Sequence, residues 1–393
     1  MAFDRLFDRL FAWRRILPLA LICLLLSSSS ILFLWRKGTT VPAIAKSRGH
    51  KSRNTLQDEI RRLYPWMIRS NYLPNFFTRQ FDPKVGKRWP SDETYAYGNC
   101  TIVFVHNQKS GGTTTKSCLI DLMKLEGDPR PRPATNLNAG DVYSTILEKG
   151  HVEVSRTSFM GDSTFSVCEF AKRPCAYFTV MRDPLERVIS SYNMCRASRQ
   201  PQCVMRDIHN MTVNDWAVHQ GSFFFRQVLV NPEFFTDEYT NLVDELRGPD
   251  DPSVELIRPW WRNKLILDHL MNDKQKALAL DYVLANLESW FAVVGLTAEY
   301  DTNFRLFERV FKLPFYKLCV GRQKNLRRDY HVLTGGEANI TKEEAVKTTK
   351  RKLSSDPEVM RALHFDIQIY KKMEDIFRRQ LLAFSEKEFV EDK

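Results

Sequence analysis

A pattern of apolar strand, polar loop and helix occurs twice in this sequence and constrains the fold more than any other feature. Residues 101–106 read TIVFVH and are followed by NQKSGGTTTK and a helix-like segment over 117–124. Residues 176–181 read AYFTVM and are followed by RDP and a helical pattern over 185–193. Short apolar runs that alternate with helices are typical of buried parallel strands. The pattern therefore predicts a P-loop-like α/β domain with a central parallel sheet, helices on both faces and further helices toward the carboxyl end.

The loop after the first strand has the composition of a phosphate-binding loop. Glycines let backbone N–H groups approach an anion, and the following helix presents its positive end to the same point. The residues concerned are Lys109, Ser110, Gly111, Gly112, Thr113 and Thr114. Their spacing departs from the nucleotidase P-loop, in which a lysine directly precedes the last hydroxyl residue. Taken alone, the loop is also compatible with an ordinary turn between a strand and a helix.

The second loop supplies two further candidates for anion binding. Arg182 ends its strand, and Ser190 lies two turns into the helix that follows. An arginine can hold a phosphate through two parallel hydrogen bonds. Ligands of open α/β sheets bind beyond the carboxyl ends of the strands, so we expect a second phosphate to bind at the same edge as the first.

The net charge of +11 is confined to the first quarter of the chain. Residues 100–393 carry 41 basic and 40 acidic side chains. The sequence has no zinc-finger, RNP-type or basic-zipper pattern, so we expect no nucleic-acid partner. It also has no cluster with metal-ligand spacing, so we expect no metal.

An apolar segment near the start of the chain predicts a membrane anchor. Residues 16–35 contain no charged side chain over 20 positions, the span that a transmembrane helix needs. A cleaved signal peptide is the alternative, but its apolar region is normally shorter and a small-x-small site follows it. Here Trp35 is followed by Arg36 and Lys37, which suits an uncleaved anchor. We expect a cytoplasmic tail at 1–15, a transmembrane anchor at 16–35, a stem at 36–97 and a lumenal domain at 98–393.

The cysteines and glycosylation sequons suit a lumenal body. Seven of the eight cysteines follow the apolar segment, and Cys168/Cys175 and Cys195/Cys203 are close enough in sequence to form bridges. Because seven is odd, at least one thiol is expected to stay free. The sequons begin at Asn99, Asn210 and Asn339. The alternative is a cytosolic domain with buried, unpaired cysteines.

Together, the two loops resemble those of the Golgi carbohydrate sulfotransferases. Lys109-Ser-Gly-Gly-Thr-Thr is similar to the K-T-G-G-T-T of heparan sulfate 6-O-sulfotransferases. Arg182-Asp-Pro-x-x-Arg187-x-x-Ser190-x-Tyr192 is closer to the 2-O-sulfotransferases. Family-like stretches over 286–297 and 365–370 extend the resemblance to about residues 100–380.

The resemblance implies transfer of a sulfuryl group from 3′-phosphoadenosine 5′-phosphosulfate to a glycan hydroxyl, in a type II protein of the Golgi membrane. No metal is implied. Lys109 matches the family lysine that contacts the transferred group. Arg182 and Ser190 would hold the 3′-phosphate. The 5′-phosphate would be held by Gly111, Gly112, Thr113 and Thr114.

The resemblance also implies a histidine base for the acceptor hydroxyl. His151 lies in a Gly-His-Val segment similar to the one that bears the catalytic histidine of 2-O- and galactose 3-O-sulfotransferases. A neutral imidazole near pH 7 is a suitable base. His106, which ends the first strand, is the next candidate, followed by Glu153.

Two further regions suggest substrate contacts. Residues 203–230 are expected to form part of an acceptor groove, with the candidates Asn210, Asp215, His219, Arg226 and Gln227. The acid-free stretch from Lys312 to Arg328 would lie near the adenine and 3′-phosphate by the same resemblance, and an ordinary solvated loop is the alternative.

Two other functions stay open at this point. A nucleotide-dependent kinase would need the nucleotidase lysine spacing and an acidic magnesium-binding strand, neither of which is evident. A glycan-binding protein without catalysis is the second alternative, against which the intact Lys109, Arg182 and Ser190 argue. The acceptor also stays open among glycosaminoglycans and galactose-terminated glycans.

The assignment of His151 predicts the behaviour of one variant. His151→Ala should leave co-substrate binding unchanged and lower the rate of the chemical step by roughly 10²–10⁴-fold, as expected for the loss of a general base. Single-turnover transfer of labelled sulfate would measure this step. An unchanged rate would move the assignment to His106.

Overall fold

The computed structural model of the chain describes residues 53–78, 93–125, 132–133, 158–171, 174–197, 210–231, 234, 236–247, 259–320 and 341–391. The predicted tail, anchor and first part of the stem lie outside these residues. So do His151, Glu153, Cys203, Asn339 and the basic residues from Arg322 to Arg328. None of the described helices is long and apolar enough to cross a membrane.

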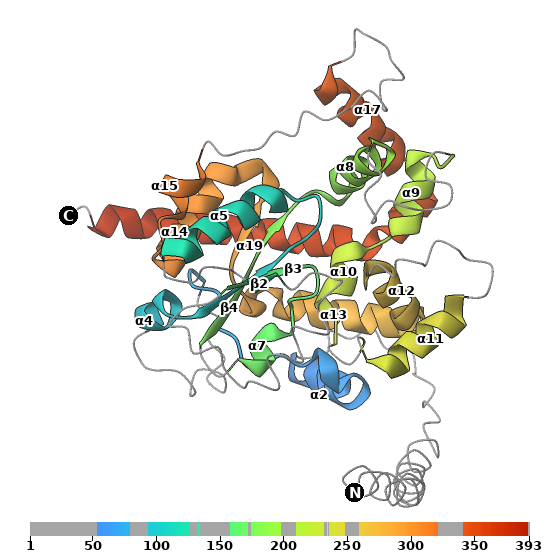
Figure 1. Cartoon of the computed structure of the whole chain (residues 1–393), viewed down its shortest axis with the longest axis horizontal. Helices are drawn as coiled ribbons and strands as arrows, with labels where there is room; N and C mark the ends of the chain where they lie inside the picture. The colour runs from blue at the N-terminus through green and yellow to red at the C-terminus, as the bar shows by residue number, and fades with distance from the viewer. Residues whose placement is uncertain are drawn as a thin grey trace, which may run out of the picture. The chain divides into compact units, whose positions relative to one another are not determined.

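A parallel sheet forms the centre of the described structure (Figure 1), as the sequence predicted. Its strand order is β2-β3-β1-β4-β5, and every described pairing is parallel. The strands are β1 (Thr101–Val105), β2 (Arg132–Pro133), β3 (Ser158–Gly161), β4 (Cys175–Met181) and β5 (Phe291–Leu296). Every residue of β1, β3, β4 and β5 is buried, which explains their continuous apolar sequences.

The strand order creates a switch point beside β1. From β1 the chain continues to β2 and β3 on one side of it, and then returns to β4 on the other side. Connections that leave neighbouring strands in opposite directions open a crevice at their carboxyl ends, where α/β folds bind ligands. The two predicted phosphate loops follow β1 and β4, so the topology brings both loops to this crevice.

Helices cover both faces of the sheet, as alternate residues of β4 show. Phe178 packs against Phe307 of α14 (Tyr300–Phe311) and Phe315 of α15 (Phe315–Cys319), with ring centroids 5.0 and 6.3 Å away. Tyr177 points to the other face, where its ring lies 4.9 Å from that of Phe165. On that face Phe165 lies 5.3 Å from Trp290, the last residue of α13 (Asp273–Trp290).

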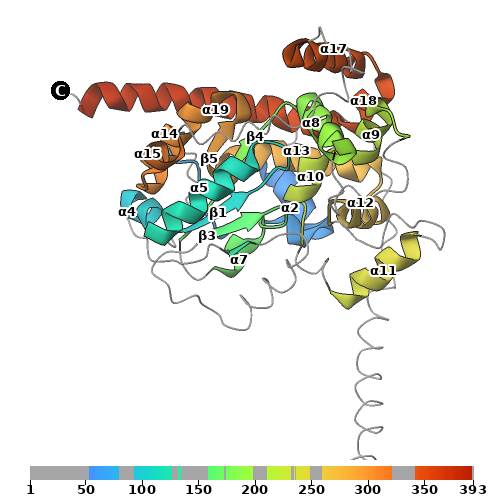
Figure 2. The ribbon, with the colours of Figure 1, turned by 45° about the horizontal axis from the view of Figure 1, so that its top comes forward.

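The remaining helices pack around this layered centre (Figure 2). α5 (Gly112–Leu125) and α8 (Pro184–Ala197) follow the two loops and contain the helices predicted at 117–124 and 185–193. A second hydrophobic cluster, separate from the main core, joins α8, α9, α17 and α18. The other bounds are α4 (Glu93–Gly98), α7 (Val167–Phe170), α9 (Val213–Gln220), α10 (Phe223–Val228), α11 (Asp237–Arg247), α12 (Pro259–Leu270), η5 (Thr297–Glu299), α17 (Lys342–Ser354), α18 (Pro357–Ala362) and α19 (His364–Glu391).

Residues 53–78, which fall in the predicted stem, are instead part of the folded core. They comprise α2 (Arg53–Leu63), the 3-10 helix η1 (Pro65–Met67) and an extended segment. Ile60 and Met67 are buried in the main core, and Leu63 packs against it. Leu73 N–H donates to the carbonyl of Cys175 at the start of β4. The boundary of the folded domain is therefore corrected from residue 98 to near residue 52.

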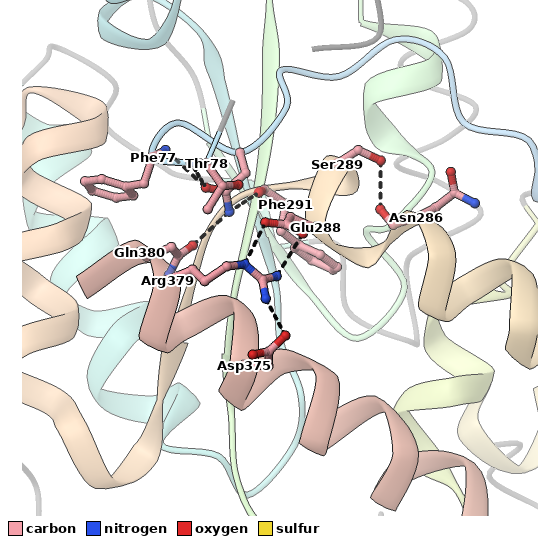
Figure 3. Close-up of polar contacts among 10 residues, drawn as sticks. Phe77, Thr78, Asn286, Glu288, Ser289, Phe291, Asp375, Arg379 and Gln380 are labelled. Atoms are coloured by element: carbon pink, nitrogen blue, oxygen red, sulfur yellow. Dashed lines mark hydrogen bonds and ion pairs between the residues drawn. The ribbon is translucent and has the colours of Figure 1, made fainter. Parts of the chain in front are cut away.

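The exposed edge of β5 is closed by side chains of α19 and the 71–78 segment (Figure 3). The Gln380 amide donates to Val294 O at 2.9 Å and accepts from Val294 N–H at 3.0 Å. It also accepts from Asn75 Nδ2 at 2.8 Å. The same turn of α19 is also linked to α13, because the Arg379 guanidinium donates to both oxygens of the buried Glu288 carboxylate, at 3.3 and 2.9 Å. These contacts give an edge strand the partners that a neighbouring strand would otherwise supply.

A disulfide joins Cys168 to Cys175 with Cα atoms 5.4 Å apart, as the sequence predicted. Cys195 is also disulfide-bonded, to a residue outside the described set. The predicted partner Cys203 lies outside the described residues, so that pairing stays a prediction. Cys118 is free and buried, in line with the expectation of at least one free thiol, and Cys100 and Cys319 are also buried.

The closed edge predicts a stability effect at Gln380. Gln380→Ala should lower the free energy of unfolding by about 2–4 kcal/mol, because it leaves the buried backbone N–H and carbonyl of Val294 without partners and removes one hydrogen bond of the Asn75 amide. Urea denaturation would measure the change. Arg378→Ala, on the exposed side of the same turn, is the control and should change stability by less than about 0.5 kcal/mol. Equal effects of the two variants would contradict this role of Gln380.

Candidate functional site

The two phosphate loops contact each other directly. Arg182, at the end of β4, donates from Nη1 to the carbonyl oxygen of Lys109 at 3.2 Å. The Lys109 ammonium in turn reaches α8, where Nζ lies 3.1 Å from Met194 Sδ. Ser190 precedes Met194 by one helical turn, so the two residues share a face of α8. The structure thus brings Lys109 and Arg182 together and places Ser190 on the helix face that Lys109 reaches.

The backbone of the first loop adopts an unusual conformation. Lys109 has φ +66° and Gly111 has φ +78°, and Ser110 lies between them. A positive φ at a lysine costs of order 1–3 kcal/mol and persists only where the surroundings impose it. Alternating backbone conformations of this kind turn successive N–H groups toward one concave point, and α5 begins at the next residue, Gly112. The strained conformation therefore gives the loop a backbone shape that suits an anion.

Tyr300, which the sequence analysis did not single out, supports this loop from α14. Its hydroxyl donates to the Ser110 carbonyl at 3.4 Å. A Cβ atom built on Gly111 would lie 1.2 Å from Tyr300 Oη, so a glycine is needed there for space as well as for φ. Burial raises the pKa of Tyr300 to about 12, so the hydroxyl keeps its proton and remains a donor.

His106 and Asp162 form a buried pair beneath the loop. His106 Nδ1 lies 2.9 Å from Asp162 Oδ1, and both side chains are almost fully enclosed. The imidazole packs so closely on α5 that a Cβ built on Gly112 would lie 1.8 Å from Nε2. Gln227 donates to the backbone carbonyls of His106 at 3.0 Å and of Asp162 at 2.9 Å. The pair and its glutamine therefore join β1, β3 and α10 where the loop starts.

The protonation states of this pair follow from its burial. Burial, together with the charge of Lys116, lowers the pKa of His106 below its ordinary value of 6.5. Burial alone would raise the pKa of Asp162, but its hydrogen bond and charge interaction with His106 and the nearby Lys116 leave it below the ordinary value. His106 is thus a neutral ring held by a carboxylate, and its position beneath the loop suits a structural role in supporting the loop.

The electrostatics of the two loops favour an anion. Burial, followed by repulsion from Arg182, lowers the pKa of Lys109, so the two cations are held close together at an energetic cost. The Ser110 hydroxyl is buried and has no hydrogen-bond partner among the described residues. Of the other predicted donors, Thr113 is exposed and Thr114 is buried at the start of α5. A bound phosphate would relieve the repulsion and offer acceptors to these groups.

Several residues predicted to line an acceptor groove have structural roles instead. Asp215 forms a capping box with Thr212 at the start of α9. Arg226 is buried and donates to the carbonyl of Gln220. Gln227 is occupied by the two carbonyls under the first loop. These three residues are therefore removed from the acceptor candidates, because their polar groups hold the fold together.

Asp366, the acidic residue of the family-like stretch at 365–370, also has a structural role. The Asp366 carboxylate accepts from the backbone N–H groups of Phe224 at 3.0 Å and Phe225 at 2.9 Å. These are the first free N–H groups of α10, so Asp366 satisfies the helix end from α19. Arg187 of the second loop is buried nearby, with its guanidinium 5.1 Å from the Phe223 ring centre. Its Nη1 donates to Gln220 Oε1 at 3.2 Å, which links α8 to α9.

The buried histidine predicts how stability depends on pH. The unfolded chain takes up a proton at His106 near pH 6.5, whereas the folded chain resists it, so stability should fall as the pH drops below 6.5. The expected loss is at most about 1 kcal/mol between pH 6.5 and 5.5. His106→Gln is the comparison: its curve should be flatter, measured by urea denaturation at each pH. Parallel curves for the two proteins would contradict the assignment.

The site lies within a region that matches a known family. Residues 93–229, from α4 through α10, match the model of the Sulfotransferase family. This stretch contains the Lys109 loop, Arg182 and Ser190. No curated protein matches the chain. Among the described residues, no group of histidine, cysteine or acidic side chains is arranged to hold a metal ion. Residues 93–229 are therefore similar to the sulfotransferases, a family whose activity is the transfer of a sulfuryl group.

Proposed function

We propose that this protein transfers a sulfuryl group from 3′-phosphoadenosine 5′-phosphosulfate to a hydroxyl group of a glycan. The observation that carries the proposal is the contact between Arg182 and the Lys109 carbonyl at the switch point of the sheet. The contact brings the two loops together. This suits a co-substrate that carries phosphates at two separated positions, because each loop can bind one of them. The match to the Sulfotransferase family supports the same reaction type.

The chemistry of the loop residues fits this co-substrate. The strained turn, the start of α5 and the unpartnered Ser110 hydroxyl are suited to the 5′-phosphate. Arg182 and Ser190 are suited to the 3′-phosphate, and the planar guanidinium can bind it with two hydrogen bonds. When bound, the co-substrate supplies an activated sulfuryl group, and adenosine 3′,5′-bisphosphate leaves.

Lys109 is the residue placed to stabilise the charge that develops on the leaving phosphate. Its ammonium is partly withdrawn from water, which strengthens its interaction with an anion. Its backbone is held by Arg182, and its side chain lies along α8, so little reorganisation is needed to direct the charge. The energetic cost of holding two cations together is thus recovered when the anion binds.

A base must also take the proton of the acceptor hydroxyl. His106 lies beneath the loop, against Asp162 and Gly112, and this position favours a role in supporting the loop. His151 therefore keeps the role of base in the proposal, on the resemblance of its Gly-His-Val segment. Neutral imidazole is the form that this role requires.

We further propose that the enzyme works in the Golgi lumen, anchored by residues 16–35 as a type II membrane protein. The Cys168–Cys175 bridge supports an oxidising compartment, because disulfides are rare in the cytosol. Residues 100–393 carry almost no net charge, which is compatible with a glycan acceptor that is bound at a local site.

One experiment separates this function from its two alternatives. The full-length protein in detergent is incubated with sulfur-labelled co-substrate and a panel of glycosaminoglycans and galactose-terminated glycans, and the position of the sulfate is found by mass spectrometry. Thermal shifts with adenosine 3′,5′-bisphosphate and ATP are compared in parallel. Stabilisation by ATP alone would indicate a kinase, and glycan binding without sulfate transfer would indicate a protein that only binds glycans.

The role of Lys109 predicts a large loss of activity in one variant. Lys109→Ala should lower the rate of sulfate transfer by at least about 10²-fold, because it removes charge stabilisation at the leaving group. The melting temperature should stay near that of the wild type. Lys124→Ala, at an exposed lysine of the same loop-helix unit, is the control and should be fully active. Near-normal turnover of the Lys109 variant would contradict the assigned role.

A further inference from the structure

A lysine far along the chain reaches the second phosphate loop. Lys350 lies on α17, and its Nζ is 3.0 Å from Asp183 Oδ2 and 3.2 Å from Glu186 Oε1. Asp183 follows Arg182 directly in the RDP motif, and Glu186 lies in the first turn of α8. Lys350 thus bridges two carboxylates that are more than 160 positions away in the sequence.

These carboxylates pose a problem for anion binding. Glu186 Oε2 lies 3.5 Å from Arg182 Nε, so it competes with a phosphate for the same guanidinium. Asp183 is fixed in place, because its side chain caps the α8 backbone through the N–H of Glu186 at 3.0 Å. Without a further cation, the segment from Arg182 to Glu186 would hold one basic and two acidic side chains. An incoming phosphate would then be repelled.

Helix packing and charge hold Lys350 in place beside the two carboxylates. α17 starts with a capping box between Thr341 and Glu344, and its buried Leu353 belongs to the same hydrophobic cluster as Val188 of α8. Burial alone would lower the pKa of Lys350, but Asp183 and Glu186 raise it above the ordinary value, so the ammonium stays charged. Tyr370 of α19 also faces this group: burial, then Glu374, Asp183 and Glu186, raises the pKa of its hydroxyl.

We propose that Lys350 is a positioning residue for the co-substrate, which neutralises Asp183 and Glu186 and thereby leaves Arg182 available for the 3′-phosphate. The proposal rests on the proposed function, because it assumes that Arg182 binds this phosphate. Lys350 itself need not touch the ligand. It acts through Glu186, because an ammonium at one carboxylate oxygen weakens the interaction of the other oxygen with the Arg182 guanidinium.

The test is a double-mutant cycle on the binding of adenosine 3′,5′-bisphosphate to the full-length protein, measured by calorimetry. Lys350→Ala should weaken binding about tenfold, or about 1.4 kcal/mol. Lys350→Arg should bind like the wild type, because it restores the charge. Glu186→Gln in the Lys350→Ala background should restore most of the lost affinity, since it removes the competing charge and keeps the shape of the side chain. A merely structural role for Lys350 predicts no rescue by Glu186→Gln.

Lys347→Ala provides a matched control on the exposed face of the same helix, with the same change in net charge. It should leave the affinity unchanged. If Lys350→Ala binds as tightly as the wild type, or if Lys347→Ala weakens binding equally, the inference about Lys350 is wrong while the proposed function stands. If the wild-type protein does not bind the bisphosphate, the proposed function fails and the inference fails with it.

Discussion

The candidate site depends on the position of β1 in the parallel sheet. Because the chain goes to β3 on one side of β1 and to β4 on the other, the loops that leave β1 and β4 meet at one edge. Arg182 then bridges the loops by donating to the carbonyl of a lysine in the left-handed conformation. This contact joins the two loops at the carboxyl edge of the sheet.

Most of the polar groups around the crevice serve to support it. His106 and Asp162 pair beneath the first loop, Gln227 satisfies their carbonyls, and Tyr300 covers the turn. These contacts hold the strained backbone of the loop in place beside two neighbouring cations, Lys109 and Arg182.

The carboxyl-terminal helices belong to the site as much as to the scaffold. α19 closes the edge of β5 with Gln380 and caps α10 with Asp366. α17 brings Lys350 to the acids beside Arg182. The region that matches the Sulfotransferase family ends at residue 229, so these contributions come from beyond it. A site assigned from the matched region alone would omit the charge balance around its arginine.

The features that the sequence determined by itself are local ones. The parallel strands, the helices after both loops and the bridge between Cys168 and Cys175 follow from short apolar runs, turn residues and a spacing of seven positions. The loop residues Lys109 and Arg182 could be named as anion ligands because each lies at the end of a strand. Such signals need only a few consecutive residues, and their physical basis lies in backbone geometry.

Only the tertiary structure decided which distant residues complete the site. Asp162, Tyr300 and Lys350 lie in unremarkable local sequences, and their roles come from contacts across the fold. The same holds for residues 53–78, whose apolar residues become core only because α13 and β4 lie beside them. Packing and charge pairing act between positions that share no local pattern, so chain topology had to be known before these residues could be assigned.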